Sequence, residues 1–383
     1  MFSFLKKKPQ DEQVHLVCLV TSYAVTAAVV KVFTRQESVQ EPVLLFSCES
    51  IIPIRDGFDY RANASLTYDA IKYALNKCRA FNPVYDKLYC SIGEPWTTSM
   101  TRTAHLEKRE AFSLTQKVID DLVTRESKLF EQEVARMYAG SEEVGLLQVS
   151  KPLIDANGYR IANPMNALVA SVDVHSTFSL VSLSFIDGVV GVFVDVFHRT
   201  DIQFTSFDLA KSALLNDYDH GTVVEMGGDT ISIVIKQGGV PTLFAAIPEG
   251  LHRFEIALMQ LFDVPQKKIP QVLSFVGDEN IIEHERERYY HRIVRAYEEI
   301  SPAIALRAID IKKHVQQLPE PVVVIGHPEW VDVLKVPLEK DLGSRVIIPR
   351  HDLFRDQVII SHQAHVITNS LLLAVMHAIR YEK

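Results

Sequence analysis

The hydrophobic and polar positions of the chain follow two different periods in turn, which predicts strands and helices in one mixed fold. Apolar, β-branched runs predict strands within 14–33, 43–54, 88–92, 167–174, 178–196, 221–235, 242–247 and 321–328. Helical spacing of apolar residues predicts helices at 68–80, 114–138, 207–215, 253–262, 279–299, 302–317 and 368–380. Within the first strand range, Thr21-Ser22-Tyr23 breaks the apolar run, so we expect two strands joined by a tight turn.

The stretch from Gly221 to Ile235 is the most informative part of this pattern. It reads as a strand, a tight turn at Gly227 and Gly228, and a second strand. Adjacent glycines let backbone N–H groups point into one concavity, which suits a phosphate. An ordinary hairpin with a Gly-Gly turn accounts for the same residues. The residues alone leave both interpretations open.

Length and composition limit the class of protein. A chain of 383 residues is too long for one small core, so we expect two or three domains. With 47% hydrophobic and 23% charged residues, the composition excludes a disordered chain. The net charge of −8 does not indicate a nucleic-acid-binding surface, and we expect no nucleic-acid partner.

Cysteine spacing and the absence of long apolar runs indicate a cytosolic protein. Cys18, Cys48, Cys78 and Cys90 lack CxxC spacing, and we expect reduced thiols in a cytosolic protein. No apolar run approaches about 18 residues, so we expect no transmembrane helix. The segment Met1–Lys8 places apolar residues beside three lysines, which predicts either weak membrane contact or a frayed terminus.

The motifs around the glycine turn resemble a known family. The order strand, glycine turn, strand, Ile-Pro-x-Gly and helix is similar to the second phosphate-binding segment of the actin-like ATPase superfamily, and within it to the FtsA/PilM branch. The family pattern Asp-Ile-Gly-Gly-Gly-Thr-Thr-Asp-Ile stands here as Glu225-Met-Gly-Gly-Asp-Thr-Ile-Ser-Ile233, followed by Ile247-Pro-Glu-Gly250. This resemblance implies an α/β, two-lobed actin-like ATPase (ribonuclease H-like) fold with an SHS2-like α+β subdomain inserted in the first lobe.

A second set of residues resembles the end of that inserted subdomain. The sequence Asn163-Pro164-Met165-Asn166 stands where FtsA carries Asn-Pro-x-Gly, and asparagine tolerates the left-handed conformation that glycine adopts. The resemblance implies a tail at 1–13, a first lobe at 14–83 and 174–213, the insertion at 84–173 and a second lobe at 214–383. In the family, the insertion binds partners and neighbouring subunits.

The resemblance also implies a nucleotide site that binds ATP with Mg²⁺. The alternative is that the protein binds no nucleotide. The implied cofactor-binding residues are Thr21, Ser22, Glu225, Gly227, Gly228, Asp229, Thr230 and Gly326. Leu19 replaces the magnesium-organising Asp of the family, and Phe207 replaces the Glu that positions the attacking water. Leucine cannot ligate a hard cation. We therefore assign no catalytic residue, and the spacing of His351, His362 and His365 does not favour a metal site.

Three functions remain open. The first is a non-enzymatic or weakly active scaffold at the cytoplasmic face of the membrane, an FtsA-like division protein that recruits partners through the insertion. The second is a PilM-like adaptor of type IV pilus assembly, and the third is a genuine ATP hydrolase. Asn163-Pro164 favours FtsA, whereas the short Met1–Lys8 start and the lack of a C-terminal membrane helix favour PilM. In the first two cases, division or pilus proteins are the expected partners, and self-association is a further alternative.

Overall fold

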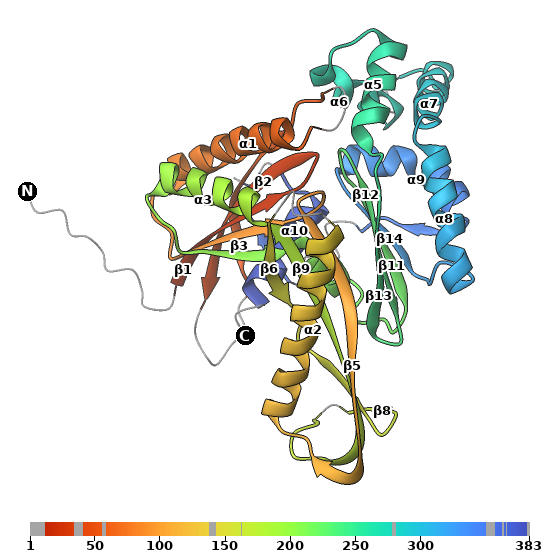
Figure 1. Ribbon diagram of the computed structural model, residues 1–383. Helices are drawn as coiled ribbons and strands as arrows, with labels where there is room; N and C mark the ends of the chain where they lie inside the picture. Colours follow the sequence, from red (N-terminus) through yellow and green to blue (C-terminus); the bar gives the residue numbers. More distant parts are fainter. Residues whose placement is uncertain are drawn as a thin grey trace, which may run out of the picture.

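The computed structural model describes residues 12–33, 41–55, 59–137, 143–161, 163–277, 281–349, 357–361, 364 and 366–380. These residues form three sheets with helices packed on their faces (Figure 1). The segment Met1–Lys8 and the residues His351, His362 and His365 lie outside the described residues. Among the residues described, no helix is both long enough and apolar enough to span a bilayer.

The first lobe is built on a six-stranded sheet in the order β10-β4-β1-β2-β3-β16. Its strands are β1 (Glu12–Val20), β2 (Ala24–Phe33), β3 (Val43–Ile51), β4 (Lys87–Ile92), β10 (Ile202–Ser206) and β16 (Ile359–Ile360). β1, β2 and β3 are antiparallel neighbours, whereas β4 and β10 run parallel to β1. One face packs against α1 (Tyr60–Phe81) and α3 (Leu183–Phe197), and the other packs against α4 (Phe207–Ala213) and α10 (Asn369–Arg380).

The second lobe repeats this strand order in a five-stranded sheet, β13-β12-β11-β14-β15. Its strands are β11 (Gly221–Met226), β12 (Ile231–Gln237), β13 (Val240–Ile247), β14 (Val322–Ile325) and β15 (Val346–Ile347). Again the first strand is central, with two antiparallel strands on one side and two parallel strands on the other. Two lobes of the same topology are what the ribonuclease H-like prediction requires.

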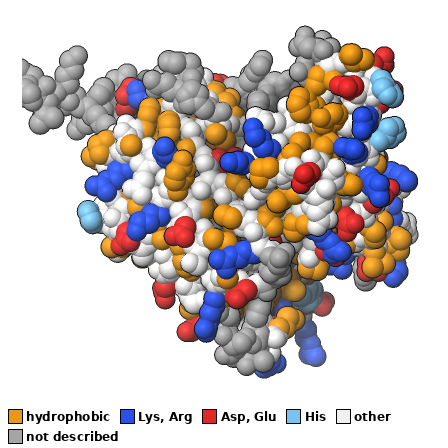
Figure 2. Space-filling model, turned by 90° about the horizontal axis from the view of Figure 1, so that it is seen from above, with side chains coloured by type: hydrophobic (Ala, Val, Ile, Leu, Met, Phe, Trp, Pro, Cys, Tyr) orange, Lys and Arg blue, Asp and Glu red, His pale blue; other side chains and the backbone are white. Residues whose placement is uncertain are grey.

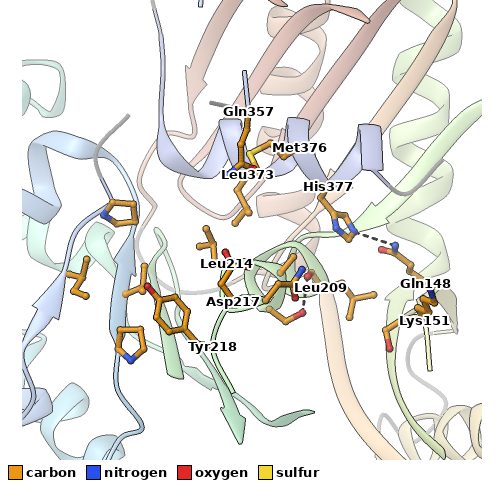
Figure 3. A pocket seen from close by; sticks show the side chains of 18 residues that line it. Gln148, Lys151, Leu209, Leu214, Asp217, Tyr218, Gln357, Leu373, Met376 and His377 are labelled. Carbon is orange, nitrogen blue, oxygen red and sulfur yellow. Dashed lines mark hydrogen bonds between the residues drawn. The ribbon is translucent and has the colours of Figure 1, made fainter. Parts of the chain in front are cut away.

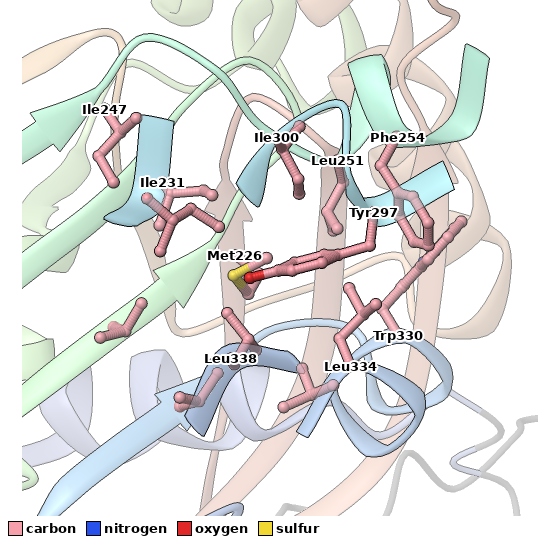
Figure 4. Close-up of a cluster of buried hydrophobic side chains, with 14 of the residues drawn as sticks. Met226, Ile231, Ile247, Leu251, Phe254, Tyr297, Ile300, Trp330, Leu334 and Leu338 are labelled. Carbon is pink, nitrogen blue, oxygen red and sulfur yellow. The ribbon is translucent and has the colours of Figure 1, made fainter. Parts of the chain in front are cut away.

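The helices of the second lobe cover one face of its sheet and enclose the largest hydrophobic cluster (Figure 4). They are α5 (Leu251–Phe262), α6 (Ile269–Gly277), α7 (Glu283–Tyr297), α8 (Ser301–Val315) and α9 (Pro328–Leu342), with a 3₁₀ turn at Gln266–Lys268. Figure 4 shows Phe254, Tyr297 and Trp330 meeting in this cluster from three different helices. Tyr23 of the first lobe is buried in the same cluster.

The chain between β4 and α3 forms a third unit that projects toward the bottom of Figure 1. It contains β5 (Thr97–Ser113), α2 (Gln116–Met137), β6 (Val144–Val149), β7 (Leu153–Ala156), β8 (Tyr159–Arg160) and β9 (Leu168–Ser182). β9 is the central strand, and α2 packs on the sheet through its apolar face. The Arg160 guanidinium donates to the carbonyl oxygen of Gly238 at 3.3 Å, so this unit contacts the second lobe.

The boundaries of this unit differ from the sequence-based ones. β4 falls inside the range 84–173, yet it pairs with β1 and β10 in the sheet of the first lobe. β9 runs through residue 173 without a break and ends at Ser182. We therefore propose that the inserted subdomain starts with β5 and ends with β9.

One predicted element is wrong. The range 178–196 was expected to be a strand, but β9 ends at Ser182 and residues Leu183–Phe197 form α3. The Ser182 hydroxyl caps the helix by accepting from the N–H of Phe185, and Phe185, Val189 and Phe193 recur at helical spacing on its buried face. Asn166 has a φ of 62°, which confirms the left-handed conformation expected there.

Surface charges of both signs are mixed on the face shown in Figure 2. Basic and acidic side chains are interspersed there, with apolar side chains between them. This face therefore presents no field of a single sign to a charged partner.

Candidate functional site

The β1–β2 turn at Thr21-Ser22-Tyr23 packs against the glycine turn between β11 and β12. The Ser22 hydroxyl oxygen accepts from the backbone N–H of Gly228 at 3.0 Å and of Asp229 at 3.1 Å. A Cβ at Gly228 would lie 2.7 Å from the Ser22 carbonyl oxygen. Glycine is therefore needed at 228 because the two turns approach each other this closely.

The start of α5 is fixed on the same turn. The N–H groups of Leu251 and His252 donate to the carbonyl oxygens of Gly227 and Gly228, at 2.8 and 2.9 Å. A Cβ at Gly250 would lie 2.3 Å from the Gly228 oxygen. Helix N-terminal N–H groups often bind anions, but at least two of those at α5 are already used inside the chain.

Tyr23, the next residue of the β1–β2 turn, also contacts the second lobe. Its hydroxyl donates to Glu255 Oε1 at 2.9 Å and accepts from Trp330 Nε1 at 3.2 Å. Its ring centroid lies 5.9 Å from that of His252 and 6.1 Å from that of His327. Burial, reinforced by the nearby Glu255 carboxylate, raises the pKa of Tyr23 well above its usual range. The phenol therefore stays neutral and keeps both hydrogen bonds.

A buried ion-pair cluster lies behind the turns. The Lys211 ammonium is 2.7 Å from Asp208 Oδ1 and 2.9 Å from Glu225 Oε2, and it also donates to the Ser232 hydroxyl. Burial lowers the pKa of Lys211, but Asp208 and Glu225 outweigh it, so the pKa lies above the usual value. The pKa of nearby Glu94 is raised to about 8 by burial and by Asp208.

The structure brings most of the predicted cofactor-binding residues to this place. Thr21, Glu225 and Gly326 line one small cavity, together with Leu19 and Tyr23. The predicted residues Ser22, Gly228 and Asp229 are hydrogen-bonded to one another beside it, and the Thr230 carbonyl oxygen accepts from the Gly227 N–H at 3.0 Å. Their role toward a nucleotide stays a prediction.

Sequence reasoning missed three residues that dominate the geometry, Tyr23, Lys211 and His252. Two of them left a signal. In the actin-like pattern that the sequence resembles, the first phosphate loop reads Asp-Ile-Gly-Ser-Ser-Ser-Val-Lys, and Tyr23 stands at one of its serines. Lys211 stands at the serine of the pattern Glu-Pro-Leu-Ala-Ser-Ala. A large aromatic and a cation at small-residue positions indicate that this chain fills space there itself.

The overall arrangement is similar to solved structures of actin-like proteins. A chain of the PilM–PilN type IV pilus biogenesis complex matches with 15% identity over 98% of this chain and 100% of that chain, at a TM-score of 0.55. The ethanolamine utilization protein EutJ from Carboxydothermus hydrogenoformans matches with 13% identity, over 96% and 91% of the two chains, at a TM-score of 0.45.

A Bacteroides thetaiotaomicron protein with an actin-like ATPase fold and unknown function matches with 11% identity over 98% of both chains, at a TM-score of 0.40. No protein-family model matches the sequence, and no curated protein matches it. Identities this low show the fold alone. The fold is the two-lobed actin-like fold that the sequence predicted.

The small cavity beside the turns is too small for a nucleotide. The cavity lined by Thr21, Glu225 and Gly326 has a volume of about 30 Å³. This volume holds about one or two water molecules, whereas small-molecule sites measure about 300–1,000 Å³. ATP with Mg²⁺ therefore stays a prediction that requires the turns to separate. Among the described residues, no group of three or more His, Cys, Asp or Glu side chains is placed to hold a metal ion.

A much larger pocket, of about 580 Å³, lies where the two lobes and the inserted subdomain meet (Figure 3). Its lining residues come from the inserted subdomain, the α4–β11 connection, the β14–β15 edge and α10, and include Lys151, Leu214, Tyr218, Ile347, Leu373 and Met376. Gln148 Nε2 lies 3.3 Å from His377 Nε2 at its wall. Burial lowers the pKa of His377 to about 4, so the imidazole is neutral at physiological pH.

Proposed function

We propose that this chain is a non-enzymatic actin-like scaffold that binds other proteins of a membrane-associated machine, as a PilM-like adaptor. The observation that carries the proposal is the state of the interlobe cleft, where the glycine turn is bonded to Ser22 and the acidic groups are changed or paired. The fold supplies a rigid body with an extra subdomain, and the cleft supplies no open catalytic centre.

The residues of the cleft argue against hydrolysis. Phosphoryl transfer in this fold depends on a positioned metal ion and an oriented water molecule. Leu19 and Phe207, which replace the two carboxylates expected for these tasks, are 1% and 0% exposed. The remaining carboxylate, Glu225, is neutralised by Lys211 at 2.9 Å. Among the described residues, no group of three or more His, Cys, Asp or Glu side chains in the cleft is placed to hold a metal ion.

The 580 Å³ pocket is the feature best suited to bind a partner protein. Its walls come from three parts of the chain, and apolar side chains such as Leu373 and Met376 alternate with polar ones such as Lys151 and Asp217 (Figure 3). A site of this volume takes a few side chains of an extended segment. We propose that a short, mainly apolar segment of a partner protein binds there.

Two machines are candidates for the partner. The PilM–PilN structure names a complex between two pilus proteins, and similarity to it over nearly the whole chain supports the adaptor role. The FtsA-like division role is the second candidate, because Asn163-Pro164 and the left-handed Asn166 match the ending of the FtsA insertion. In both roles the protein acts at the cytoplasmic face of the membrane.

Site-specific photocrosslinking in the native host tests this proposal. A photoreactive amino acid is placed at Tyr218, which lines the pocket and is 49% exposed, and as a control at Tyr73 on α1, which is 51% exposed. We expect an adduct with a pilus-assembly protein from position 218 alone. An adduct with a division protein would favour the FtsA-like role, and equal labelling at both positions would contradict a partner site in the pocket.

A further inference from the structure

The side chain of Tyr23 belongs to one lobe by sequence and to the other by packing. Its backbone forms the turn between β1 and β2, but the ring is 6% exposed and lies in the hydrophobic cluster of the second lobe. Both of its hydrogen-bond partners, Glu255 on α5 and Trp330 on α9, are second-lobe residues. Of the residues described between Glu12 and Phe81, Tyr23 and its neighbour Ala24 are the two that belong to that cluster.

Ser22 makes the second contact of the same turn. Its hydroxyl oxygen accepts two N–H groups of the glycine turn, those of Gly228 and Asp229. Consecutive backbone N–H groups that converge on one point form an anion-binding concavity. Here the acceptor at that point is the chain's own hydroxyl oxygen, which stands where a phosphate oxygen would accept.

Charged groups around the turn make further contacts between the two lobes. The Asp229 carboxylate lies 3.0 Å from His252 Nδ1 and accepts from Asn63 Nδ2 of the first lobe at 3.4 Å. Glu49 of β3 lies 3.5 Å from His327 of the second lobe. These polar contacts bridge the lobes on either side of Tyr23, and the Asp229 charge repels an incoming phosphate.

Behind the turn, the Glu225 carboxylate is paired with the Lys211 ammonium at 2.9 Å. The cavity that Glu225 lines together with Thr21 and Tyr23 has a volume of about 30 Å³.

We infer that the β1–β2 turn is an internal plug: Ser22 fills the concavity of the glycine turn, and the Tyr23 ring fills a socket in the second lobe. The plug holds the lobes closed without nucleotide. The lobes separate only when the Tyr23 ring leaves its socket among His252, His327 and Trp330. This inference concerns the cleft alone and does not depend on which partner the pocket binds.

Cavity rescue tests the plug. Tyr23→Ala removes the ring and leaves a phenol-shaped cavity, so we expect the Tm to fall by roughly 5–10 °C. Millimolar phenol should restore part of the loss, because the socket is formed by other residues. Tyr73→Ala, at an exposed position, is the control and should change little, with or without phenol. A Tyr23→Ala protein that keeps the wild-type Tm, or gains nothing from phenol, overturns the inference.

Hydrogen exchange of a second variant covers the case in which Tyr23→Ala does not fold. Ser22→Ala removes the acceptor of the Gly228 and Asp229 amides, so the peptide covering 226–230 should exchange about 3- to 10-fold faster than in the wild type. Unchanged exchange in that peptide contradicts the role of Ser22. Either failure would leave the crosslinking result of the pocket untouched, so the two proposals are tested separately.

Discussion

Lys211 has the surroundings that depart furthest from the family pattern. It is fully buried with Asp208 and Glu225 against its ammonium, and burying such charges costs several kcal/mol per ion unless they are paired and hydrogen-bonded. The pairing offsets this cost and, at the same time, leaves Glu225 without a free charge for a metal ion. The same residue thus stabilises the floor of the cleft and neutralises one of its carboxylates.

Glu94 makes the free energy of unfolding depend on pH. Its pKa of about 8 in the folded protein lies above the ordinary 4.5, through burial and the Asp208 carboxylate. The protonated form is therefore favoured by the fold. This carboxyl imposes no penalty below about pH 4.5. Its penalty grows between pH 4.5 and 8, where the unfolded state ionises first, and reaches its full size above pH 8.

We expect Glu94→Gln to stabilise the protein more at pH 8.5 than at pH 5.5, because the amide never ionises. The additional gain in the free energy of unfolding should be on the order of 2–4 kcal/mol. Urea denaturation at the two pH values measures it, with Glu110→Gln on the exposed side of β5 as a control of equal charge change. A Glu94→Gln effect that is the same at both pH values would contradict a raised pKa at this residue.

Among the elements, the β11–β12 turn and the start of α5 form one unit. The turn offers carbonyl oxygens to the first N–H groups of α5 and offers its own N–H groups to Ser22. The N–H groups of Leu251 and His252 at the helix end, and those of Gly228 and Asp229 in the turn, are thereby satisfied within the chain. The β11–β12 turn and the start of α5 therefore bind other parts of the chain.

Gly250→Ala tests this docking. The new Cβ would lie 2.3 Å from one backbone oxygen and 2.6 Å from another, so α5 must shift, and we expect a loss of about 1–3 kcal/mol in the free energy of unfolding. The matched control is Gly191→Ala in α3, where nothing lies within 4 Å and a gain of about 0.5–1 kcal/mol is expected. Equal urea midpoints for the two variants would refute the close approach at Gly250.

The elements also show what the sequence could predict. The strands β1 to β4 and β11 to β14 follow from apolar, largely β-branched runs, because buried runs such as those of β11 and β12 need no distant partner to be recognised. The shorter strands β10, β15 and β16 were not predicted. α3 was mistaken for a strand because its valines and phenylalanines favour both structures, and only the Ser182 cap and the recurrence of Phe185 and Phe193 separate them.

At the scale of the whole molecule, the fold could be predicted and the state of the site could not. The two-lobed arrangement follows from motif order along the chain, and the repeated strand order agrees with it. The closure of the cleft depends on contacts between segments far apart in the chain. Ser22 and Gly228 are 206 residues apart, and no local pattern shows that a hydroxyl oxygen will fill the concavity of the glycine turn.

The most direct test of the whole account is a crystal structure of the wild-type protein grown in millimolar Mg-ATP. We expect the Tyr23 ring to remain against Trp330 and the Ser22 hydroxyl to remain on the amides of Gly228 and Asp229, with no nucleotide between the lobes. A nucleotide bound between the Gly227-Gly228 turn and Gly326, with Tyr23 displaced from its socket, would contradict it.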